Sequence, residues 1–152
     1  MERLWTPSVT VAAVLERDGH FMLVEELIDG RRVLNQPAGH WERGESLVQA
    51  CTRETLEECG VAFTPTALVG IYRWAFTRDG NEITFLRFTF AGDVGERNPA
   101  RALDRDIVAT HWLTHAALSA RSAEHRSPLV MRSVDDFIAG KRYSLDVLAH
   151  LD

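Results

Sequence analysis

The sequence predicts an α/β or α+β fold in which a mixed β-sheet packs around one central helix. Runs rich in β-branched and aromatic residues, separated by Asp-Gly turns, stand before and after a single strongly patterned helical segment. Most of the other helical sequence lies late in the chain. The 152 residues suit one domain with a sizeable core, so we expect a single domain over residues 1–152.

Turn signals divide the β-rich sequence into six expected strands. Asp-Gly pairs are strong hairpin signals because both residues tolerate the positive φ of a tight turn, and they occur at residues 18–19, 29–30 and 79–80. A loop from Pro37 to Glu45 precedes the central helix. The expected strands, in chain order, are residues 9–15, 20–26, 32–36, 66–76, 83–90 and 107–113.

The central helix is expected from Ser46 to Cys59. Ser46 and Gln49 have the spacing of a capping box, in which each side chain accepts a hydrogen bond from the other residue's backbone N–H. Gly60 supplies the left-handed residue that commonly ends a helix. Shorter helices are expected later in the chain, at residues 115–120, 130–138 and 144–151.

Composition and charge narrow the function classes. The net charge is −5 and no run of Lys or Arg is present, so the chain lacks the electrostatic footprint of a protein that binds nucleic acid polymers. A small nucleotide stays compatible with this charge when a cation bridges it to the protein. No apolar run approaches the ~20 residues of a membrane span, and residues 1–7 carry no signal-peptide pattern. We therefore expect a small-molecule substrate as the partner, and neither a nucleic acid polymer nor a membrane.

The two cysteines, Cys51 and Cys59, lie eight residues apart on the expected helix. At about 1.5 Å of rise per residue they are separated by ~12 Å, beyond the Cα separation of about 7 Å that a disulfide allows. They are expected to be free thiols. Free thiols and the absence of a targeting pattern predict a cytoplasmic protein.

Three carboxylates share one side of the expected helix. At about 100° per residue, Glu54, Glu57 and Glu58 fall in a sector that borders the apolar face. Carboxylates this close repel one another, and the repulsion grows near a core because the local dielectric falls. Taken alone, the cluster indicates either a solvated acidic helix face or a functional site.

The residues around the cluster extend it into a longer pattern. It reads Gly-x5-Glu-x7-Arg-Glu-Thr-x-Glu-Glu-x-Gly-Val, from Gly39 to Val61. This pattern resembles the signature of the Nudix hydrolase superfamily, whose invariant positions are all filled. Thr55, in a slot that is usually hydrophobic, is a minor departure. The resemblance implies an α/β/α sandwich with a mixed sheet and a central catalytic strand–loop–helix–loop, and cleavage of a diphosphate linkage.

The resemblance also implies a role for each residue of the pattern. The implied metal ligands are Glu54, Glu57, Glu58 and the backbone carbonyl of Gly39. The implied catalytic residues are Glu54, Glu58, Arg53 and Glu45, with Arg53 and Glu45 as an ion pair that fixes the loop. Ligands that are all oxygen suit Mg²⁺, with Mn²⁺ as the alternative.

The general base stays open at this point. Glu54 and Glu58 are candidates within the pattern. Members of the superfamily often recruit another acid from a loop before a late strand, and Asp104 and Asp106 precede the strand expected at residue 107. An ordinary polar turn explains these two aspartates equally well.

Four further segments resemble the NudJ-type phosphatase branch of the superfamily: residues 7–12, 35–40, 85–88 and 126–130. This resemblance implies nucleoside tri- and diphosphates, and a pyrimidine diphosphate precursor of thiamine, as substrates that release inorganic phosphate. Residues 67–79 lack the proline common in the ADP-ribose branch.

Several residues outside the signature are candidates for substrate binding. Arg87 interrupts an apolar strand, so it is either a phosphate ligand or part of an exposed strand face. Trp74 can stack on a ring, as can Trp41 and Trp112, although core or surface packing is the more common role of a tryptophan. His40 follows Gly39, so it either points at the phosphates or is explained by loop geometry alone.

Two other functions remain open, and so does the oligomeric state. The first is a nucleotide pyrophosphohydrolase, which attacks an inner phosphorus and releases pyrophosphate. The second is a non-catalytic Nudix-like nucleotide-binding domain, which is expected to lose some of the signature carboxylates, whereas this chain retains all of them. The protein is expected to be a monomer or a homodimer.

Overall fold

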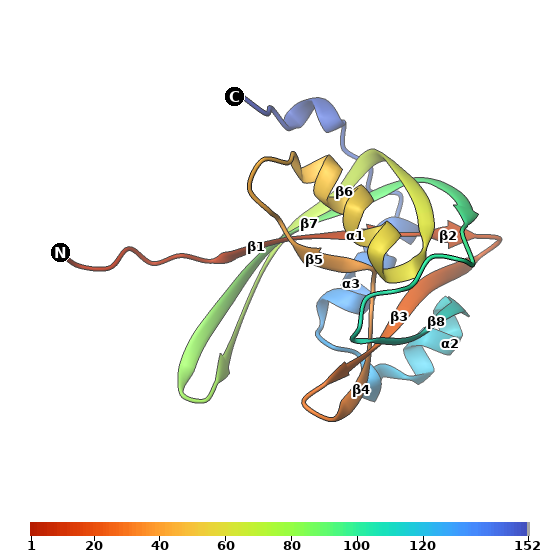
Figure 1. The fold of residues 1–152 in the computed structure, drawn as a ribbon, viewed down its shortest axis with the longest axis horizontal. Helices are drawn as coiled ribbons and strands as arrows, with labels where there is room; N and C mark the ends of the chain where they lie inside the picture. The colour runs from red at the N-terminus through yellow and green to blue at the C-terminus, as the bar shows by residue number, and fades with distance from the viewer. Residues whose placement is uncertain (152) are drawn as a thin grey trace.

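Two β-sheets form the body of the protein in the computed structural model, which describes residues 1–151 (Figure 1). The first sheet has the strand order β5-β1-β7-β6 and is mixed, because β1 runs parallel to β7 while its other pairs are antiparallel. In the second sheet β3 pairs antiparallel with β2, β4 and β8. The strands are β1 (Ser8–Val14), β2 (Glu16–Arg17), β3 (His20–Ile28), β4 (Arg31–Asn35), β5 (Ala38–His40), β6 (Val61–Arg78), β7 (Asn81–Arg97) and β8 (Ile107–Thr114).

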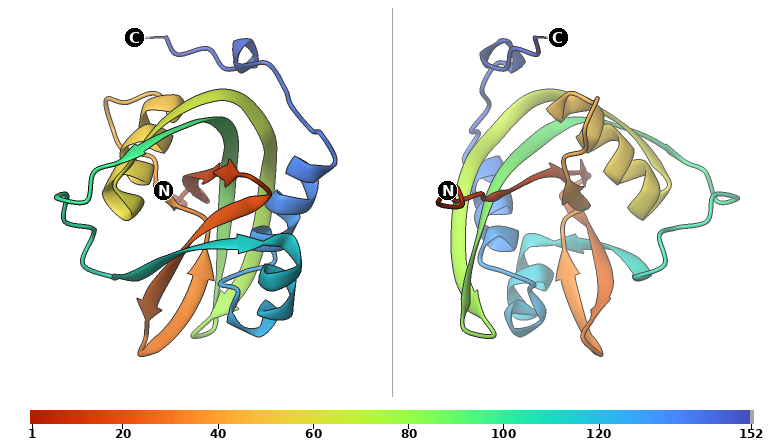
Figure 2. Two further views of the ribbon diagram at one scale, coloured as in Figure 1. Left: turned by 90° about the vertical axis from the view of Figure 1, so that its right-hand side faces the viewer. Right: turned by 60° about the vertical axis from the view of Figure 1, so that its left-hand side comes forward.

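The helices lie on opposite sides of the strands (Figure 2). They are α1 (Leu47–Cys59), α2 (His115–Ala120) and α3 (Leu129–Ile138), with 3₁₀ turns η1 (Ser122–Glu124) and η2 (Leu145–Val147). Successive residues of a strand point to opposite faces, and β1 divides its side chains accordingly. Val11 packs in a core cluster with Cys51 of α1, whereas Val14 packs with Val130 and Val134 of α3. This layering confirms the α/β/α sandwich.

Helix α1 forms where the sequence predicts it. The hydroxyl of Ser46 accepts a hydrogen bond from the Gln49 backbone N–H at 3.1 Å, and the Gln49 side chain accepts one from the Ser46 backbone N–H at 2.8 Å. Gly60 ends the helix with φ of 70°. Both cysteines are free and buried on the core side, as expected. Within residues 1–151, no helix has the length and apolar character needed to cross a membrane.

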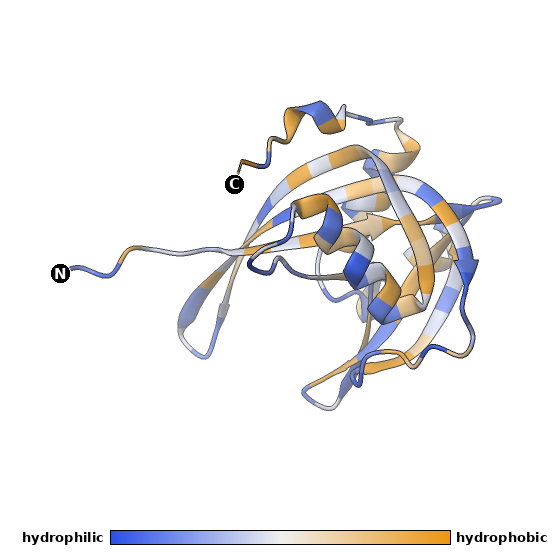
Figure 3. Cartoon of the chain, turned by 45° about the horizontal axis from the view of Figure 1, so that its top comes forward, coloured by the Kyte–Doolittle hydropathy of each residue, from blue (hydrophilic) through white to orange (hydrophobic). Residues whose placement is uncertain are grey.

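The hairpin of β6 and β7 is longer than expected and extends past the rest of the sheet (Figure 1). Its tip, at Asp79 and Gly80, is hydrophilic (Figure 3) and has positive φ at both residues. The expected strands covered residues 66–76 and 83–90, whereas β6 begins at Val61 and β7 ends at Arg97. In the structure the register shifts after Pro65, and Gly92 admits the Thr64 backbone where a Cβ would collide with it.

Two other expectations need correction. The loop expected from Pro37 to Glu45 contains β5, which pairs with β1 and places Gly39 opposite Val11. The helix expected over residues 144–151 is only the 3₁₀ turn η2. Short helices gain too few hydrogen bonds to offset the cost of nucleation, and Leu148 is already extended.

The start of α3 follows the sequence closely. The helix begins at Leu129, one residue before the expected Val130. Pro128 already has helical angles, with φ of −60° and ψ of −19°. The hydroxyl of Ser127 accepts a hydrogen bond from the Leu129 backbone N–H at 3.1 Å. Gln36 ties this end of the helix to the sheet, because its Nε2 donates to the Val130 carbonyl at 2.8 Å.

Candidate active site

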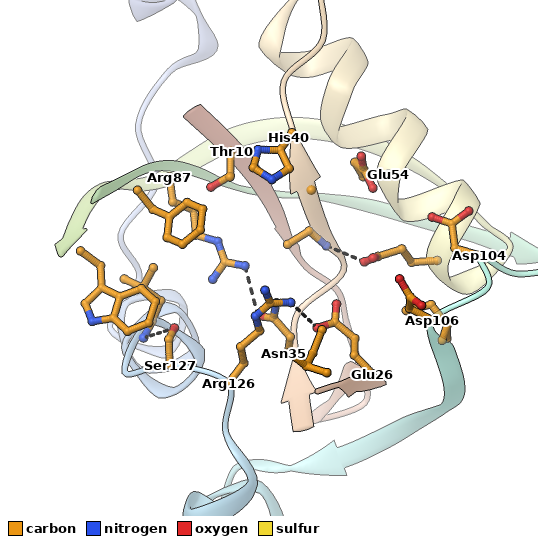
Figure 4. A pocket seen from close by; sticks show the side chains of 18 of the residues that line it. Thr10, Glu26, Asn35, His40, Glu54, Arg87, Asp104, Asp106, Arg126 and Ser127 are labelled. Atoms are coloured by element: carbon orange, nitrogen blue, oxygen red, sulfur yellow. Dashed lines mark hydrogen bonds and ion pairs between the residues drawn. The ribbon is translucent and has the colours of Figure 1, made fainter. Parts of the chain in front are cut away.

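A pocket with a volume of about 420 Å³ is lined by both sheets, by α1 and by the segments that precede β8 and α3 (Figure 4). Acidic side chains line one side, where Glu54, Asp104 and Asp106 lie in the figure. Arg87 and Ser127 lie on the opposite side. The pocket therefore joins an acidic region to a region rich in hydrogen-bond donors.

Helix α1 places its carboxylates at the edge of the core. Glu54 and Glu58 are buried and Glu57 is half-buried, as expected for residues that border the apolar face. Burial raises the pKa of Glu58 to about 9, although its Oε1 accepts a hydrogen bond from the Ala38 backbone N–H at 2.8 Å. Burial also raises the pKa of Glu54, and Arg53 opposes this shift.

Asp104 completes a group of three carboxylates with Glu54 and Glu57. One oxygen from each residue lies within 4.8 Å of the other two. The backbone N–H of Asp104 donates to the Glu57 carbonyl at 3.0 Å, which attaches the loop before β8 to α1. Asp106 also lines the pocket. The turn that contains Asp104 and Asp106 is thus part of the acidic region. Glu58 lies beside this region and accepts a hydrogen bond from the β5 backbone.

The acidic region fits a hard divalent cation. Its donors are all oxygens, which Mg²⁺ and Mn²⁺ prefer. Gly39 lies against it so closely that a Cβ at this position would overlap the Glu54 carboxylate. Only glycine therefore lets the backbone of β5 approach the carboxylates of α1.

Arg53 connects the loop before α1 to these carboxylates. Its Nε and Nη2 donate to the two oxygens of Glu45 at 2.9 and 2.7 Å. Its Nη1 donates to Glu54 at 2.8 Å and to Glu57 at 3.2 Å, and Nη2 also reaches the His40 carbonyl at 3.0 Å. These hydrogen bonds from Arg53 lower the pKa of Glu45. The expected ion pair is present, and it extends to two carboxylates of the acidic group.

Arg87 is buried at the other side of the pocket. The residue is only 5 % exposed, so the exposed strand face considered for it is wrong. Its Nη2 donates to Asn35 Oδ1 at 3.1 Å, and within residues 1–151 no carboxylate oxygen lies within 4.0 Å of its guanidinium. Burial lowers its pKa to about 10, so the guanidinium stays charged at neutral pH.

Aromatic side chains stand next to Arg87 on the long hairpin. Trp74 and Phe85 are paired residues of β6 and β7, with ring centroids 6.1 Å apart and planes 13° apart. Phe76 stacks on Trp74, with their ring centroids 4.3 Å apart. His40 lines the pocket, and its ring centroid lies 6.3 Å from that of Phe85.

The other two tryptophans considered for ring binding lie outside the pocket lining. Trp41 donates from Nε1 to the Glu45 carbonyl at 2.7 Å. The guanidinium carbon of Arg17 lies 5.2 Å from the ring centroid of Trp112. Local packing therefore accounts for both of them, and Trp74 is the tryptophan that the fold brings to the pocket.

Sequence reasoning missed an ion pair in the pocket between the exposed Arg126 and the buried Glu26. Arg126 Nη1 donates to Glu26 Oε2 at 2.7 Å, and Glu26 is 4 % exposed. Asn35 and Thr10 also line this region. Glu25 and Glu26 interrupt the apolar sequence of β3, so a charge on a buried strand was the available signal. Arg126 is 100 residues away in sequence, and no local pattern connects the two.

Comparison with known proteins identifies the family. A family model described as NUDIX domain matches residues 5–133. The chain belongs to the Nudix family. Phosphatase NudJ of Escherichia coli (strain K12) is 36% identical over 145 residues, which cover 95% of this chain and 92% of that protein. Phosphatase NudJ of Shigella boydii serotype 4 (strain Sb227) gives the same figures.

Solved structures agree with this assignment. A NUDIX hydrolase from Nitrosomonas europaea is 51% identical, with a TM-score of 0.91, and the match covers 96% of this chain and 98% of that one. A MutT NUDIX hydrolase from Burkholderia pseudomallei shares the fold, with a TM-score of 0.68 at 19% identity. This Nudix hydrolase is therefore an enzyme that acts on phosphoanhydride bonds.

Proposed function

We propose that this Nudix hydrolase is a Mg²⁺-dependent phosphatase that removes inorganic phosphate from nucleoside tri- and diphosphates and from a pyrimidine diphosphate precursor of thiamine. The proposal depends on one pocket that has carboxylate oxygens able to bind a metal ion at one side and the buried guanidinium of Arg87 at the other. Beside Arg87 stands an aromatic wall, formed by Trp74 and Phe85. Relatives named Phosphatase NudJ, matched over nearly the full length, support the choice of phosphatase.

The cation is assigned to the acidic region. Glu54, Glu57, Glu58 and the Gly39 carbonyl are the proposed ligands, with Asp104 close enough to join them. Mg²⁺ is the proposed ion and Mn²⁺ the alternative. When bound, such an ion offsets phosphate charge and makes a water more acidic.

The protein's own residues are given three kinds of role. Glu54 and Glu58 are proposed to accept the proton of the attacking water, and Asp106 is the alternative because it lines the same pocket. Arg53 and Glu45 are positioning residues, since Arg53 bonds both the loop and the carboxylates. The proposed substrate-binding residues are Arg87, Trp74 and His40.

The setting proposed for the enzyme follows from charge and chemistry. The chain is taken as a single Nudix domain over residues 1–152, a monomer or homodimer in the cytoplasm. Its two buried free thiols suit a reducing compartment. Its net charge of −5 suits a small-molecule substrate more than a nucleic acid polymer.

A phosphate-release screen tests this function. Nucleoside tri- and diphosphates, a pyrimidine diphosphate and ADP-ribose are each incubated with the protein and Mg²⁺, and inorganic phosphate and pyrophosphate are quantified separately. We expect phosphate from the first three classes and no turnover in excess EDTA. Pyrophosphate as the main product from a triphosphate would instead support the pyrophosphohydrolase.

A further inference from the structure

Arg87 is a buried charge that forms no ion pair within residues 1–151, although the buried carboxylates of Glu26 and Glu58 attract it from farther away. One of the five N–H groups of its guanidinium donates to a neutral amide, the Asn35 Oδ1, at 3.1 Å. A buried charge is costly unless it is paired. The folded protein therefore holds a cation ready for an anion that reaches it through the pocket.

The groups around Arg87 present donors to the pocket. The side-chain oxygen of Asn35 accepts a hydrogen bond from Arg87, so its amide N–H groups can donate to a ligand. The Ser127 oxygen accepts from the Leu129 backbone, and its hydroxyl hydrogen stays available to donate. Arg126 keeps further N–H groups beside the one that Glu26 engages. This donor set suits the several acceptor oxygens of a phosphate.

The donor set and the aromatic wall lie on the same face of the sheet. Phe85 is two residues before Arg87 on β7, so both side chains point to one face. Trp74 pairs with Phe85 across the hairpin. Glu54 and Asp104 lie across the pocket from Arg87 (Figure 4). A ring next to Trp74 and a phosphate next to Arg87 therefore belong to the same half of one ligand.

We propose that Arg87, with Asn35 and Ser127, holds the phosphate that leaves with the organic product, while the attacked terminal phosphate lies at the acidic region. The substrate class is then a diphosphate or longer ester of an alcohol that carries a flat ring. The proposal rests on the proposed phosphatase function for its direction of attack.

The reaction step balances without a further reagent. The water oxygen bonds to the terminal phosphorus, the bond from that phosphorus to the bridging oxygen breaks, and the bridging oxygen keeps the electron pair. The water proton passes to a carboxylate of the acidic region. The negative charge that appears on the departing phosphate lies beside Arg87, where a guanidinium binds phosphate oxygens well.

Product binding without catalysis tests the subsite. Uridine monophosphate and inorganic phosphate are titrated into the protein in excess EDTA, with tryptophan fluorescence and calorimetry as readouts. We expect the wild type to bind the nucleotide, and Arg87→Met to bind it about 10- to 100-fold more weakly because charge-assisted hydrogen bonds are lost. Arg87→Lys should retain part of the affinity. The matched control is Arg73→Met, an exposed arginine on the neighbouring strand.

A second readout guards against a folding defect in the buried variant. In the wild type, the ¹⁵N-labelled side-chain Nε–H signal of Arg87 should shift on addition of uridine monophosphate. No binding by the wild type in EDTA, or equal affinity in folded Arg87→Met, overturns the subsite. Absence of phosphate release in the screen, together with Arg87-dependent nucleotide binding, would keep the subsite and refute the phosphatase.

Discussion

The guanidinium of Arg53 holds both oxygens of Glu45, with Nε and Nη2 at 2.9 and 2.7 Å. Its remaining Nη1 bonds Glu54 and Glu57. One planar side chain thus sets the position of the loop before α1 relative to two proposed metal ligands. Lysine carries the same charge as a single point and lacks the planar fork.

Arg53→Lys should therefore weaken Mg²⁺ binding while leaving the fold intact. Residues that orient metal ligands typically contribute about 10- to 100-fold to metal affinity, and we expect a rise of that size in the Mg²⁺ concentration for half-maximal rate. A Mg²⁺ titration of phosphate release measures it. An unchanged Mg²⁺ dependence would show that the two-point contact has no positioning role.

Glu57→Gln and Glu58→Gln should each remove most turnover. Each amide keeps the shape of the side chain and loses the charge that the carboxylate carries when a cation is bound, and in Glu58→Gln the amide oxygen can still accept from the Ala38 N–H. We expect losses larger than the about 10- to 100-fold that supporting residues cost. Glu96→Gln, an exposed change on β7, is the control. Wild-type rates in both variants would remove these residues from the metal site.

Gly39→Ala should damage both stability and metal binding. The added Cβ would overlap the Glu54 carboxylate, and overpacking of this kind costs about 1–3 kcal/mol. Gly80→Ala separates the two effects, because Gly80 has φ of 76° and open space around its Cβ. We expect Gly80→Ala to lower the free energy of unfolding in urea without changing the Mg²⁺ dependence. Equal Mg²⁺ dependence in Gly39→Ala would contradict the close approach of β5.

Asp136 should make stability depend on pH at the acidic end. Burial opposes ionisation of its carboxyl, but hydrogen bonds from Tyr72, Lys141 and Arg132 outweigh this and hold its pKa below the ordinary value. A carboxyl with a lowered folded pKa stabilises the protein above its unfolded pKa, and that stabilisation disappears as pH falls through the folded pKa. The loss is therefore expected below about pH 4.

Asp136→Asn tests this linkage. At pH 7 the variant should be less stable by about 1–3 kcal/mol, because hydrogen bonds to a charged group are weakened. At pH 3 the gap between the variant and the wild type should narrow. Asp135→Asn is the matched control, since the side chain of Asp135 is exposed and its carboxylate bonds the exposed His115. Urea unfolding at both pH values measures the four differences, and a constant gap for Asp136→Asn would contradict the shift.

Local signals in the sequence predicted α1 and the ion pair of Arg53 with Glu45. The cap at Ser46, the stop at Gly60 and the spacing of the carboxylates are all encoded within a few turns of chain. The pairing of Glu26 with Arg126 is not, because it depends on how β3 meets the segment before α3. The full length of β6 was hidden by Pro65, which the register shift accommodates.

Arg87 shows the same division between local and tertiary information. Its charge in an apolar strand marked it as unusual, but the strand pattern alone allowed either face to be solvated. Its burial follows from the packing of the second sheet and of the Arg126–Ser127 segment around the pocket. Only the tertiary arrangement shows that its guanidinium donates a hydrogen bond to Asn35.

Hydrolysis of a nucleoside triphosphate in ¹⁸O-labelled water, with Mg²⁺ and mass spectrometry of the products, tests the phosphatase proposal most directly. Attack at the terminal phosphorus places the label in inorganic phosphate and releases unlabelled diphosphate first. We expect this result, with the diphosphate appearing before the monophosphate. Pyrophosphate together with label in the nucleoside monophosphate would contradict it and would show that this Nudix hydrolase attacks the inner phosphorus.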